Sequence, residues 1–516
     1  MEEELENTEL DLDVLRTNAD VAFEMGFYQE ALDCYLKLDR TIPNDQSLIF
    51  NIIVCLFRLG ESMKVIRYCD HVLSLGKEIH KDKLSDIYFY KGICYEMERD
   101  YNKAINDFLL YVRLSPKSKF VFSFIGDCYM QLNDPHNAAK SFLEFDENIL
   151  ELMKRYKNRE VISLMLDAEI EDKDNPTLFS KVISDGGIED INSDEYKAYK
   201  DIYIKVLEII SSLHVNNENE KSVAHYTRIS TAEQLIFNNS SFRLNTILTA
   251  NDPKEGLDLF GFLNLNETDN DVSSDFQAFI GSFTFNHDSL NQFRLYGKED
   301  DKEATGISLV LNEKFFNRSI VNCVNPSCIL DDKRNDDEMN DKKSLFRCIY
   351  VDPVSKQLIS IGQREKWTFY RENRENIEKA DLIIESYREY IDERFNYVKN
   401  GLNELKLLID NLGENKKVNM LSELLLMLRY LTKNMAFKEE QECRVMTIEN
   451  ITKNPNIFPK KGDGGFSQMY INYLTVSDWI EKIYFAPKAK GREMFNTQIN
   501  RFGLDIECHE STHKIS

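Results

Sequence analysis

Two glutamates separated by one residue, Glu440 and Glu442, form the sequence feature with the clearest chemical potential. We expect them on one face of a strand, because alternate side chains of a strand point to the same face. Two carboxylates side by side repel each other unless a function or a cation compensates for the repulsion. Such a pair can transfer a proton or stabilise a developing positive charge. Arg444, expected on the same face, could instead form a purely structural ion pair with them.

Other polar side chains occur where short strands are expected. His225 and Tyr226 are adjacent, Ser282 and Thr284 flank a phenylalanine, and Arg243 lies in an aromatic-rich run. Each has an ordinary structural interpretation as well as a functional one. A histidine beside a tyrosine is commonly a hydrogen-bonded core pair, and an alternating Ser-Phe-Thr run is typical of a half-buried strand. A forked guanidinium can pair with a phosphate or with any carboxylate.

These residues belong to a region that predicts an α+β domain, residues 221–516. Short runs rich in β-branched and aromatic residues, bounded by turn signals, predict strands. They lie at residues 223–226, 242–244, 279–285, 306–311, 347–351, 443–448, 482–485 and 506–509. A helical insertion is expected at about residues 371–434, where leucines repeat at helical spacing. The charged segment 331–343 predicts a protease-sensitive loop.

The first part of the chain repeats with a period of 34 residues. Corresponding positions are Gly26, Gly60, Arg99 and Asn133, with five extra residues between the second and third, and Gly92 and Gly126 also lie 34 apart. Each repeat predicts a helical hairpin in which a small residue lets two helices approach and an aromatic side chain fills the gap. One hairpin cannot bury its apolar face alone, so the copies must stack. We therefore expect at least eight helices before residue 150 and no strand between residues 10 and 145.

These repeats resemble the tetratricopeptide repeat (TPR), over residues 10–156. The resemblance implies an all-α TPR-like solenoid whose concave surface holds a protein or peptide partner. A helical connector is expected at residues 157–220, ending in the polar stretch 214–220. The fold class is thus multidomain, with an all-α solenoid followed by an α+β domain.

Composition limits the classes of partner. The chain has 516 residues and a formal net charge of −24, which argues against nucleic acid as the main partner. The first 13 residues hold seven acidic and no basic residues, unlike a secretory signal. We expect no membrane span, and a protein that stays in the cytoplasm or reaches another cell without a cleavable signal. The ten cysteines are scattered without a CxxC pair, so we expect reduced thiols and no metal site.

Six blocks of the α+β domain occur in an order and spacing that resemble the bacterial DUF2971 family, a domain family of unknown function. The blocks are His225-Tyr226-Thr227, Arg243-Leu244 with Asn251-Asp252-Pro253 and Glu255, Ser282-Phe283-Thr284, Phe293 to Gly297 with Gly306, Phe437 to Arg444, and Ile483 to Ala489. The resemblance covers about residues 222–511, interrupted by the helical insertion. Three positions depart from the family pattern: Phe293 replaces a tryptophan, Thr284 a serine, and Ala486 a glycine.

That family in turn looks like the ADP-ribosyltransferase superfamily, so an ADP-ribosyltransferase-like fold is implied. His225, Ser282 and Glu442 match its three site positions in order, and Glu440 with Glu442 matches an ExE pair. The resemblance implies NAD as the substrate. Glu442 would then stabilise the oxocarbenium ion that develops as the bond to nicotinamide breaks. Glu440 would activate the acceptor.

The same resemblance implies binding roles for the remaining candidates. His225 would hold a ribose hydroxyl or the diphosphate, and Tyr226 would stack on nicotinamide or pack behind it. Ser282 would brace the catalytic carboxylate, with Thr284 beside it on the same strand. Arg243 would pair with the diphosphate.

Three functions are compatible with these residues. The first is an NAD-dependent ADP-ribosyltransferase that acts on a protein selected by the repeats. The second is a non-catalytic adaptor whose C-terminal domain keeps the fold and senses a ligand. The third is an NAD glycohydrolase that uses the same carboxylates.

Overall fold

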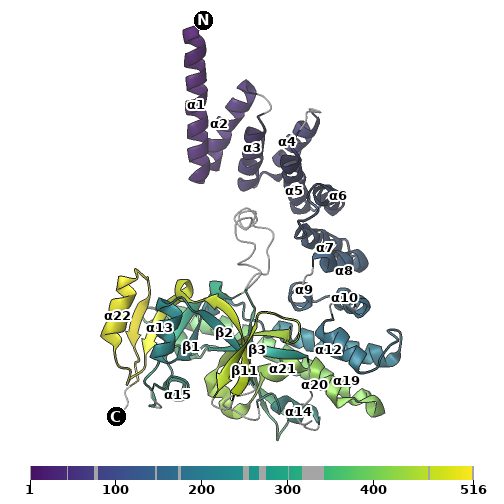
Figure 1. Ribbon diagram of the computed structural model, residues 1–516, viewed down its shortest axis with the longest axis vertical. Helices are drawn as coiled ribbons and strands as arrows, with labels where there is room; N and C mark the ends of the chain where they lie inside the picture. Colours follow the sequence, from purple (N-terminus) through teal and green to yellow (C-terminus); the bar gives the residue numbers. More distant parts are fainter. Residues whose placement is uncertain are drawn as a thin grey trace. The chain divides into compact units, whose positions relative to one another are not determined.

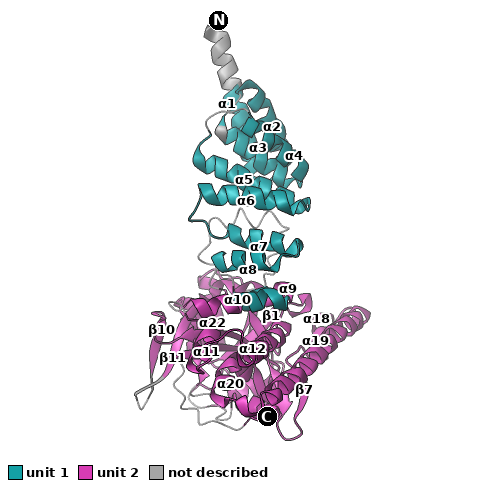
Figure 2. Ribbon diagram, turned by 90° about the vertical axis from the view of Figure 1, so that its right-hand side faces the viewer, with its two compact units in different colours: residues 1–152, 158–165, 321–335 teal, residues 153–157, 166–320, 336–516 magenta. Residues whose placement is uncertain are grey.

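The structure is a computed structural model in which ten stretches of the chain are described. They are residues 2–42, 45–74, 79–145, 148–172, 176–247, 255–265, 275–299, 302–316, 342–462 and 465–513. The Asn-Asp-Pro turn expected at 251–253, and all but the last two residues of the charged segment 331–343, lie outside them. The chain divides into two compact units, coloured in Figure 2: unit 1 comprises residues 1–152, 158–165 and 321–335, and unit 2 comprises residues 153–157, 166–320 and 336–516.

Unit 1 is built from consecutive helices, as predicted (Figure 1). Its first eight are α1 (Glu2–Glu24), α2 (Tyr28–Thr41), α3 (Gln46–Arg58), α4 (Ser62–Ser74), α5 (Lys81–Met97), α6 (Tyr101–Leu114), α7 (Val121–Gln131) and α8 (Pro135–Phe145). Neighbours in sequence pack on one another, as α5 does on α6 and α7 on α8. The described residues between 10 and 145 contain no strand. These findings confirm an all-α repeat architecture for this unit.

The repeat register corresponds to one backbone conformation. The four register positions all have positive φ: Gly26 (80°), Gly60 (73°), Arg99 (61°) and Asn133 (55°). Each follows the first helix of a hairpin, and the next N–H donates to a carbonyl five residues earlier, as Phe27 does to Ala22 at 2.8 Å. This is the Schellman ending of a helix, which favours glycine but accepts asparagine. The repeated feature is therefore the left-handed helix end itself.

A glycine and an aromatic ring interlock in the third and fourth repeats. A Cβ atom on Gly92 would lie 2.6 Å from the ring of Phe108, and one on Gly126 would lie 2.4 Å from the ring of Phe142. Both distances are far below a van der Waals contact. Only glycine therefore lets the two helices of each hairpin approach this closely, as the spacing of these residues predicts.

Unit 2 takes in most of the predicted connector together with the helical insertion. The connector helix α12 (Asp194–Ser212) packs along α19 (Ile377–Asn411). The two helices are close at Gly401, where an added Cβ atom would lie only 2.8 Å from the side chain of Ile209. Further helices that the structure describes within unit 2 are α11 (Leu178–Asp185), α13 (Ile229–Phe237), α14 (Asp258–Leu263), α15 (Leu290–Leu295), α18 (Lys366–Glu372), α20 (Val418–Leu424), α21 (Leu426–Leu431) and α22 (Arg492–Arg501). Among the described residues, no helix combines the length and apolarity needed to cross a bilayer.

A ten-stranded sheet forms the core of unit 2 (Figure 1). Its main order is β10-β11-β2-β3-β1-β4-β12-β13, and β9 pairs with β3 and β5. The strands are β1 (Ser222–Thr227), β2 (Ser241–Thr246), β3 (Phe276–Thr284), β4 (Ile307–Asn312), β5 (Leu345–Arg347), β9 (Glu442–Asn450), β10 (Ile457–Gly462), β11 (Gly465–Thr475), β12 (Ile480–Phe485) and β13 (Glu507–Glu510). A second sheet has the order β7 (Gln357–Ile361), β6 (Ile349–Asp352), β8 (Thr432–Asn434). Strands occur at all eight predicted places, whereas β7, β8, β10 and β11 were not predicted.

The pairing of three strands brings the candidate residues together. In the antiparallel pair β3–β9, Thr284 lies opposite Glu442 and Ser282 lies opposite Arg444. Directly opposite side chains share a face of the sheet. Strand β1 joins at Ala224, which pairs with Thr284. The α+β domain thus places three segments that are distant in sequence side by side.

Candidate functional site

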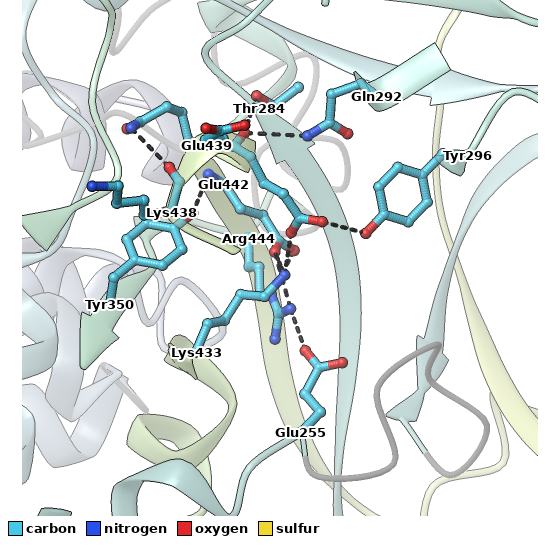
Figure 3. A network of polar contacts seen from close by, with 12 residues as sticks. Glu255, Thr284, Gln292, Tyr296, Tyr350, Lys433, Lys438, Glu439, Glu442 and Arg444 are labelled. Atoms are coloured by element: carbon cyan, nitrogen blue, oxygen red, sulfur yellow. Dashed lines mark hydrogen bonds and ion pairs between the residues drawn. The ribbon is translucent and has the colours of Figure 1, made fainter. Parts of the chain in front are cut away.

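One cleft of unit 2 is lined by six of the seven candidate residues. Its volume is about 570 Å³, which lies within the usual range of ligand sites. The six residues are His225, Tyr226, Ser282, Thr284, Glu440 and Glu442. They come from β1, β3, the start of β9 and the 3₁₀ helix that precedes β9. Figure 3 shows the polar network at one side of this cleft.

Glu442 is the first residue of β9 and is held by two cations. Its Oε1 accepts a hydrogen bond from Arg444 Nε at 2.7 Å, and its Oε2 accepts one from Lys433 Nζ at 2.6 Å (Figure 3). Its backbone N–H donates to the Tyr350 hydroxyl at 2.8 Å. The residue is only 6% exposed. The main chain is therefore fixed by Tyr350 of β6, and the side chain by Lys433 of β8 and by Arg444 of β9 itself.

Glu440 reaches the same place by a different route. It ends the 3₁₀ helix η5 (Met435–Glu440), and Gln441 follows with a left-handed φ of 47°. The expectation that Glu440 and Glu442 share a strand face is therefore wrong, because only Glu442 lies in β9. The two carboxylates meet because a tight turn separates them and because Lys433 pairs with both.

The buried charges of this network do not cancel. Glu255 also pairs with Arg444, so three carboxylates contact two cations. Counting Glu255, Glu440 and Glu442 against Lys433 and Arg444 leaves one excess negative charge. The excess lies at the carboxylates, away from the lining residues Lys298 and Lys460, and it favours a positive charge beside Glu440 and Glu442 in a bound molecule or in a transition state.

The carboxylate of Glu442 stays ionised at neutral pH. Burial alone would raise its pKa, but Arg444 and Lys433 outweigh burial and hold the pKa well below its usual value. Burial would lower the pKa of Lys433, but Glu442 and Glu440 raise it above its usual range. Glu442 can therefore stabilise positive charge and cannot serve as a proton donor.

The peptide of Glu442 is also supported by the strands that precede the insertion. The Glu442 carbonyl accepts from Cys348 N–H at 3.0 Å, and a Cβ on Gly362 would lie 2.3 Å from this carbonyl oxygen. The Gln441 side chain accepts from Gln363 N–H at 2.9 Å. Glycine at 362 thus permits the close approach that fixes the turn between the two glutamates.

His225 forms part of the cleft wall in a defined tautomer. Its Nδ1 lies 3.0 Å from the Ser282 carbonyl oxygen, which can only accept, so Nδ1 carries the proton. Burial lowers the pKa of the ring, and the bond to Ser282 opposes this only in part. Phe242 packs edge-on against the ring, with 4.8 Å between centroids. A neutral His225 keeps Nε2 as a hydrogen-bond acceptor.

The hydroxyls of Tyr226 and Thr284 are engaged in structural bonds. Tyr226 Oη donates to the Asn286 carbonyl and accepts from Ser289 N–H, both at 2.8 Å. Thr284 Oγ1 donates to the Glu440 carbonyl at 2.6 Å. Of the two alternatives for Tyr226, these bonds favour packing behind the site. Thr284 acts on the site by holding the turn that carries Glu440.

Ser282 does not brace Glu442. The Glu442 carboxylate is held by Arg444 and Lys433 instead, and Ser282 lies opposite Arg444 with an exposed side chain. The expected brace is wrong because the β3–β9 register places Thr284, and not Ser282, opposite Glu442. Ser282 contributes its carbonyl oxygen to His225 and its side chain to the cleft surface.

Arg243 lies outside the set of described residues that line the cleft. Its guanidinium stacks on the ring of Tyr470, 4.4 Å from the centroid, on the neighbouring strand β11. The basic side chains that do line the cleft, apart from the ion-paired Lys433 and Arg444, are Lys298 and Lys460. These two lysines are better placed than Arg243 to meet an anionic group.

Sequence reasoning missed three members of the network. Glu255 and Tyr296 lie within the blocks that resemble the family, but the sequence assigned neither residue a role. In the structure, Tyr296 Oη donates a hydrogen bond to Glu440 Oε1 at 2.8 Å. Lys433 falls at the end of the predicted insertion, where leucines dominate the pattern. The one available signal was its position directly before the Phe437–Arg444 block.

The paired glycines of the fourth block have a packing role. A Cβ on Gly306 would lie 2.4 Å from the Gly297 Cα, so the two backbones are in direct contact. Thr305 N–H donates to the Gly297 carbonyl at 3.2 Å, and the Gly306 carbonyl accepts from Ala486 N–H at 3.0 Å. This contact joins the segment that carries Tyr296 to β4 and to the end of β12.

No protein-family model and no curated protein matches the chain. Two solved structures show a weak likeness to part of it. The first, described as the MamA RS-1 ArsTM double mutant, is 16% identical with a TM-score of 0.25, covering 34% of this chain and 89% of that chain. The second, a tetratricopeptide repeat protein from Parabacteroides merdae ATCC 43184, is 16% identical with a TM-score of 0.25, covering 38% and 74%. The repeat architecture of unit 1 rests on its own helices, turns and packing.

Proposed function

We propose that the cleft of unit 2 binds NAD and transfers its ADP-ribose group to a protein. The observation that carries the proposal is the convergence of His225, Ser282 and Glu442. These residues are distant in sequence, come from three strands, and line one ligand-sized cleft. A chance set of polar residues would not be expected to meet around a buried carboxylate whose pKa is held low by two cations.

The chemistry follows from the charge that develops. When the bond between ribose C1′ and nicotinamide breaks, nicotinamide leaves with the electron pair and the ribose becomes oxocarbenium-like. The Glu442 carboxylate is the group that would stabilise this cation. The acceptor then bonds to C1′, and Glu440 would receive its proton. The neutral Nε2 of His225 would accept a hydrogen bond from a ribose hydroxyl.

The lining of the cleft suits a dinucleotide. Leu295 and Phe437 provide apolar surface against which a flat heterocycle can pack. Lys298 and Lys460 provide cations for phosphate groups. The division into apolar wall, carboxylate pair and lysines matches the three chemical parts of NAD: base, ribose and diphosphate.

Unit 1 would select the protein to be modified. Stacked helical hairpins present a continuous surface that suits a peptide or helix of a partner. The resemblance of these hairpins to tetratricopeptide repeats supports a binding role over a catalytic one.

One observation favours a second function, a non-catalytic ligand sensor. Both oxygens of Glu442 are occupied by cations, and Lys433 also pairs with Glu440. A carboxylate pair that is saturated in this way has less capacity to stabilise a further positive charge. In this case the domain would bind a nucleotide and regulate the repeat unit without consuming NAD.

The test is incubation of the full chain with NAD labelled in the adenylate part, with and without cell lysate. Release of nicotinamide together with labelling of a lysate protein supports the transferase. Release without labelling favours a glycohydrolase, and neither signal, with saturable NAD binding, favours the sensor.

A matched pair of variants sharpens this test. Glu440→Gln should reduce labelling of the acceptor more than it reduces NAD hydrolysis, because Glu440 acts on the acceptor. Glu439→Gln changes an exposed neighbouring glutamate outside the cleft lining and should alter neither signal. Equal loss of both signals in Glu440→Gln would contradict the assigned role.

A further inference from the structure

Lys433 occupies a position that no feature of its own sequence segment explains. It lies on β8, where it pairs with Tyr350 of β6, and the residue is 7% exposed. Its ammonium reaches across to Glu440 on η5 and to Glu442 on β9 (Figure 3). A lysine of the helical insertion thus bridges the two carboxylates to which the proposed function assigns the chemistry.

The other polar groups at this point do not provide the same bridge. Arg444, from β9, binds Glu442 and Glu255, while Tyr296 donates to Glu440 alone. Lys433 is the group that both Glu440 and Glu442 contact. Two carboxylates in a buried site repel each other strongly unless a cation lies between them, since the low local dielectric increases the repulsion.

We infer that Lys433 is a positioning residue that holds the carboxylates of Glu440 and Glu442 together. This inference rests on the proposed function for its catalytic consequence, although the ion pairs themselves are independent of it. The bridge brings both carboxylates to the same side of the cleft despite the turn at Gln441. Without it, the carboxylates of Glu440 and Glu442 would move apart.

Lys433 cannot itself act as a nucleophile or base in this arrangement. Both carboxylates favour its protonated form and raise its pKa, although burial and Arg444 oppose them. Its role is therefore electrostatic and geometric. The groups that face the pair are Arg444 and Glu255, the hydroxyls of Tyr296 and Tyr350, and the thiol of Cys348.

Chemical rescue provides a test that does not depend on NAD turnover. Lys433→Ala leaves a space for an ammonium, and n-propylammonium is the probe. We expect Lys433→Ala to melt at a lower temperature than wild type. Its melting temperature should then rise saturably as n-propylammonium chloride is added, and should not do so with the same concentration of sodium chloride. Wild type and Lys438→Ala, which changes an exposed lysine of η5, should not respond to the amine.

The same samples report the catalytic consequence. Nicotinamide release by Lys433→Ala should fall about 10²-fold, as expected for misplaced catalytic groups, and recover in part with the amine. The loss should be greatest at acid pH, because one of the two cations that keep Glu442 ionised is gone. Lys433→Arg should retain the wild-type pH profile of turnover, because it keeps the positive charge. This variant provides the test if Lys433→Ala does not fold.

The two proposals fail in distinguishable ways. If wild type releases no nicotinamide but the amine restores the stability of Lys433→Ala, the bridge holds and the transferase proposal fails. If Lys433→Ala keeps wild-type turnover and pH profile, or its stability is indifferent to the amine, the inference is overturned. A Lys433→Arg variant whose turnover fell off at acid pH as steeply as that of Lys433→Ala would also overturn it.

Discussion

The Glu442→Gln variant separates a catalytic carboxylate from a structural one. Glutamine keeps the size of the side chain and removes its charge. One oxygen can still accept from Arg444, but the amide then presents N–H groups toward Lys433 or Arg444, where only donors are available. The change therefore costs stability as well as charge.

The structure sets the size of that cost. Breaking a buried ion pair typically costs about 3 to 5 kcal/mol when it leaves a charge unpaired, against about 0.2 to 1 kcal/mol for an exposed pair. Here Arg444 keeps Glu255 and Lys433 keeps Glu440, so neither cation loses its last partner. We expect a loss of about 2 to 4 kcal/mol, which overlaps only the lower part of the range for an unpaired charge.

Turnover should change by more than stability can explain. A preorganised group that stabilises developing charge contributes about 10²–10³ to turnover, and NAD affinity should change much less. The assay is nicotinamide release beside denaturant unfolding. Glu220→Gln is the matched control, because Glu220 forms a fully buried pair with Arg347 outside the cleft lining. It should lose at least as much stability, about 3 to 5 kcal/mol, because the fully buried Arg347 pairs with Glu220 through both of its terminal nitrogens, and it should keep its turnover. Unchanged turnover in folded Glu442→Gln would refute the assignment.

Three further predictions concern stability. Burial and nearby cations lower the pKa of His287 to about 4, so His287 is neutral in the folded protein, whereas in the unfolded chain it is protonated below about pH 6.5. The free energy of unfolding should therefore fall by up to about 3 kcal/mol between pH 6.5 and pH 4. Denaturant titrations of His287→Gln should show a weaker dependence on pH. Burial and the nearby Asp127 raise the pKa of Glu96 to about 8, so the folded protein favours the protonated carboxyl group. Unit 1 should therefore lose stability as the pH rises from about 4.5 to 8. Melting curves at pH 6 and pH 8 should show that Glu96→Gln removes this loss. Gly126→Ala should destabilise unit 1 by about 1 to 3 kcal/mol, measured by denaturant unfolding, because the added methyl collides with Phe142, and a change below about 0.5 kcal/mol would contradict the packing account.

The repeats were predictable because their signals are local. Gly26 and Gly60 end helices in a conformation that glycine favours, and Gly92 with Phe108 repeats 34 residues later as Gly126 with Phe142. Each signal involves residues of one hairpin or of adjacent hairpins. Such patterns survive in a single sequence because neighbouring residues satisfy them.

The geometry of the carboxylate pair was not predictable in the same way. Alternation along a strand placed Glu440 and Glu442 on one face, but Gln441 adopts a left-handed conformation that its side-chain bond to Gln363 helps to hold. The sequence pattern placed Lys433 at the end of a leucine-rich helix. Its partners Glu440 and Glu442 lie on η5 and β9, which that pattern does not include. Both features depend on contacts between segments that no local pattern records.

The candidate residues were found, but several of their roles were not. Ser282 and Thr284 were placed on the correct strand, yet only the β3–β9 register shows that Thr284, and not Ser282, lies opposite Glu442. Arg243 was a reasonable phosphate ligand by chemistry and stacks on Tyr470 instead. Residue type indicates which chemistry is available, while strand register decides which residues can perform it.

The most direct test of the central claim is an experimental structure of the chain with a non-hydrolysable NAD analogue, in which carbon replaces the ribose ring oxygen. The account predicts that the analogue lies in the cleft, with a nicotinamide-side ribose hydroxyl within hydrogen-bond distance of the Glu442 carboxylate and the ribose bordered by His225. Binding of the analogue elsewhere on unit 2, or no binding at millimolar concentration while Glu442 keeps its ion pairs, would contradict it.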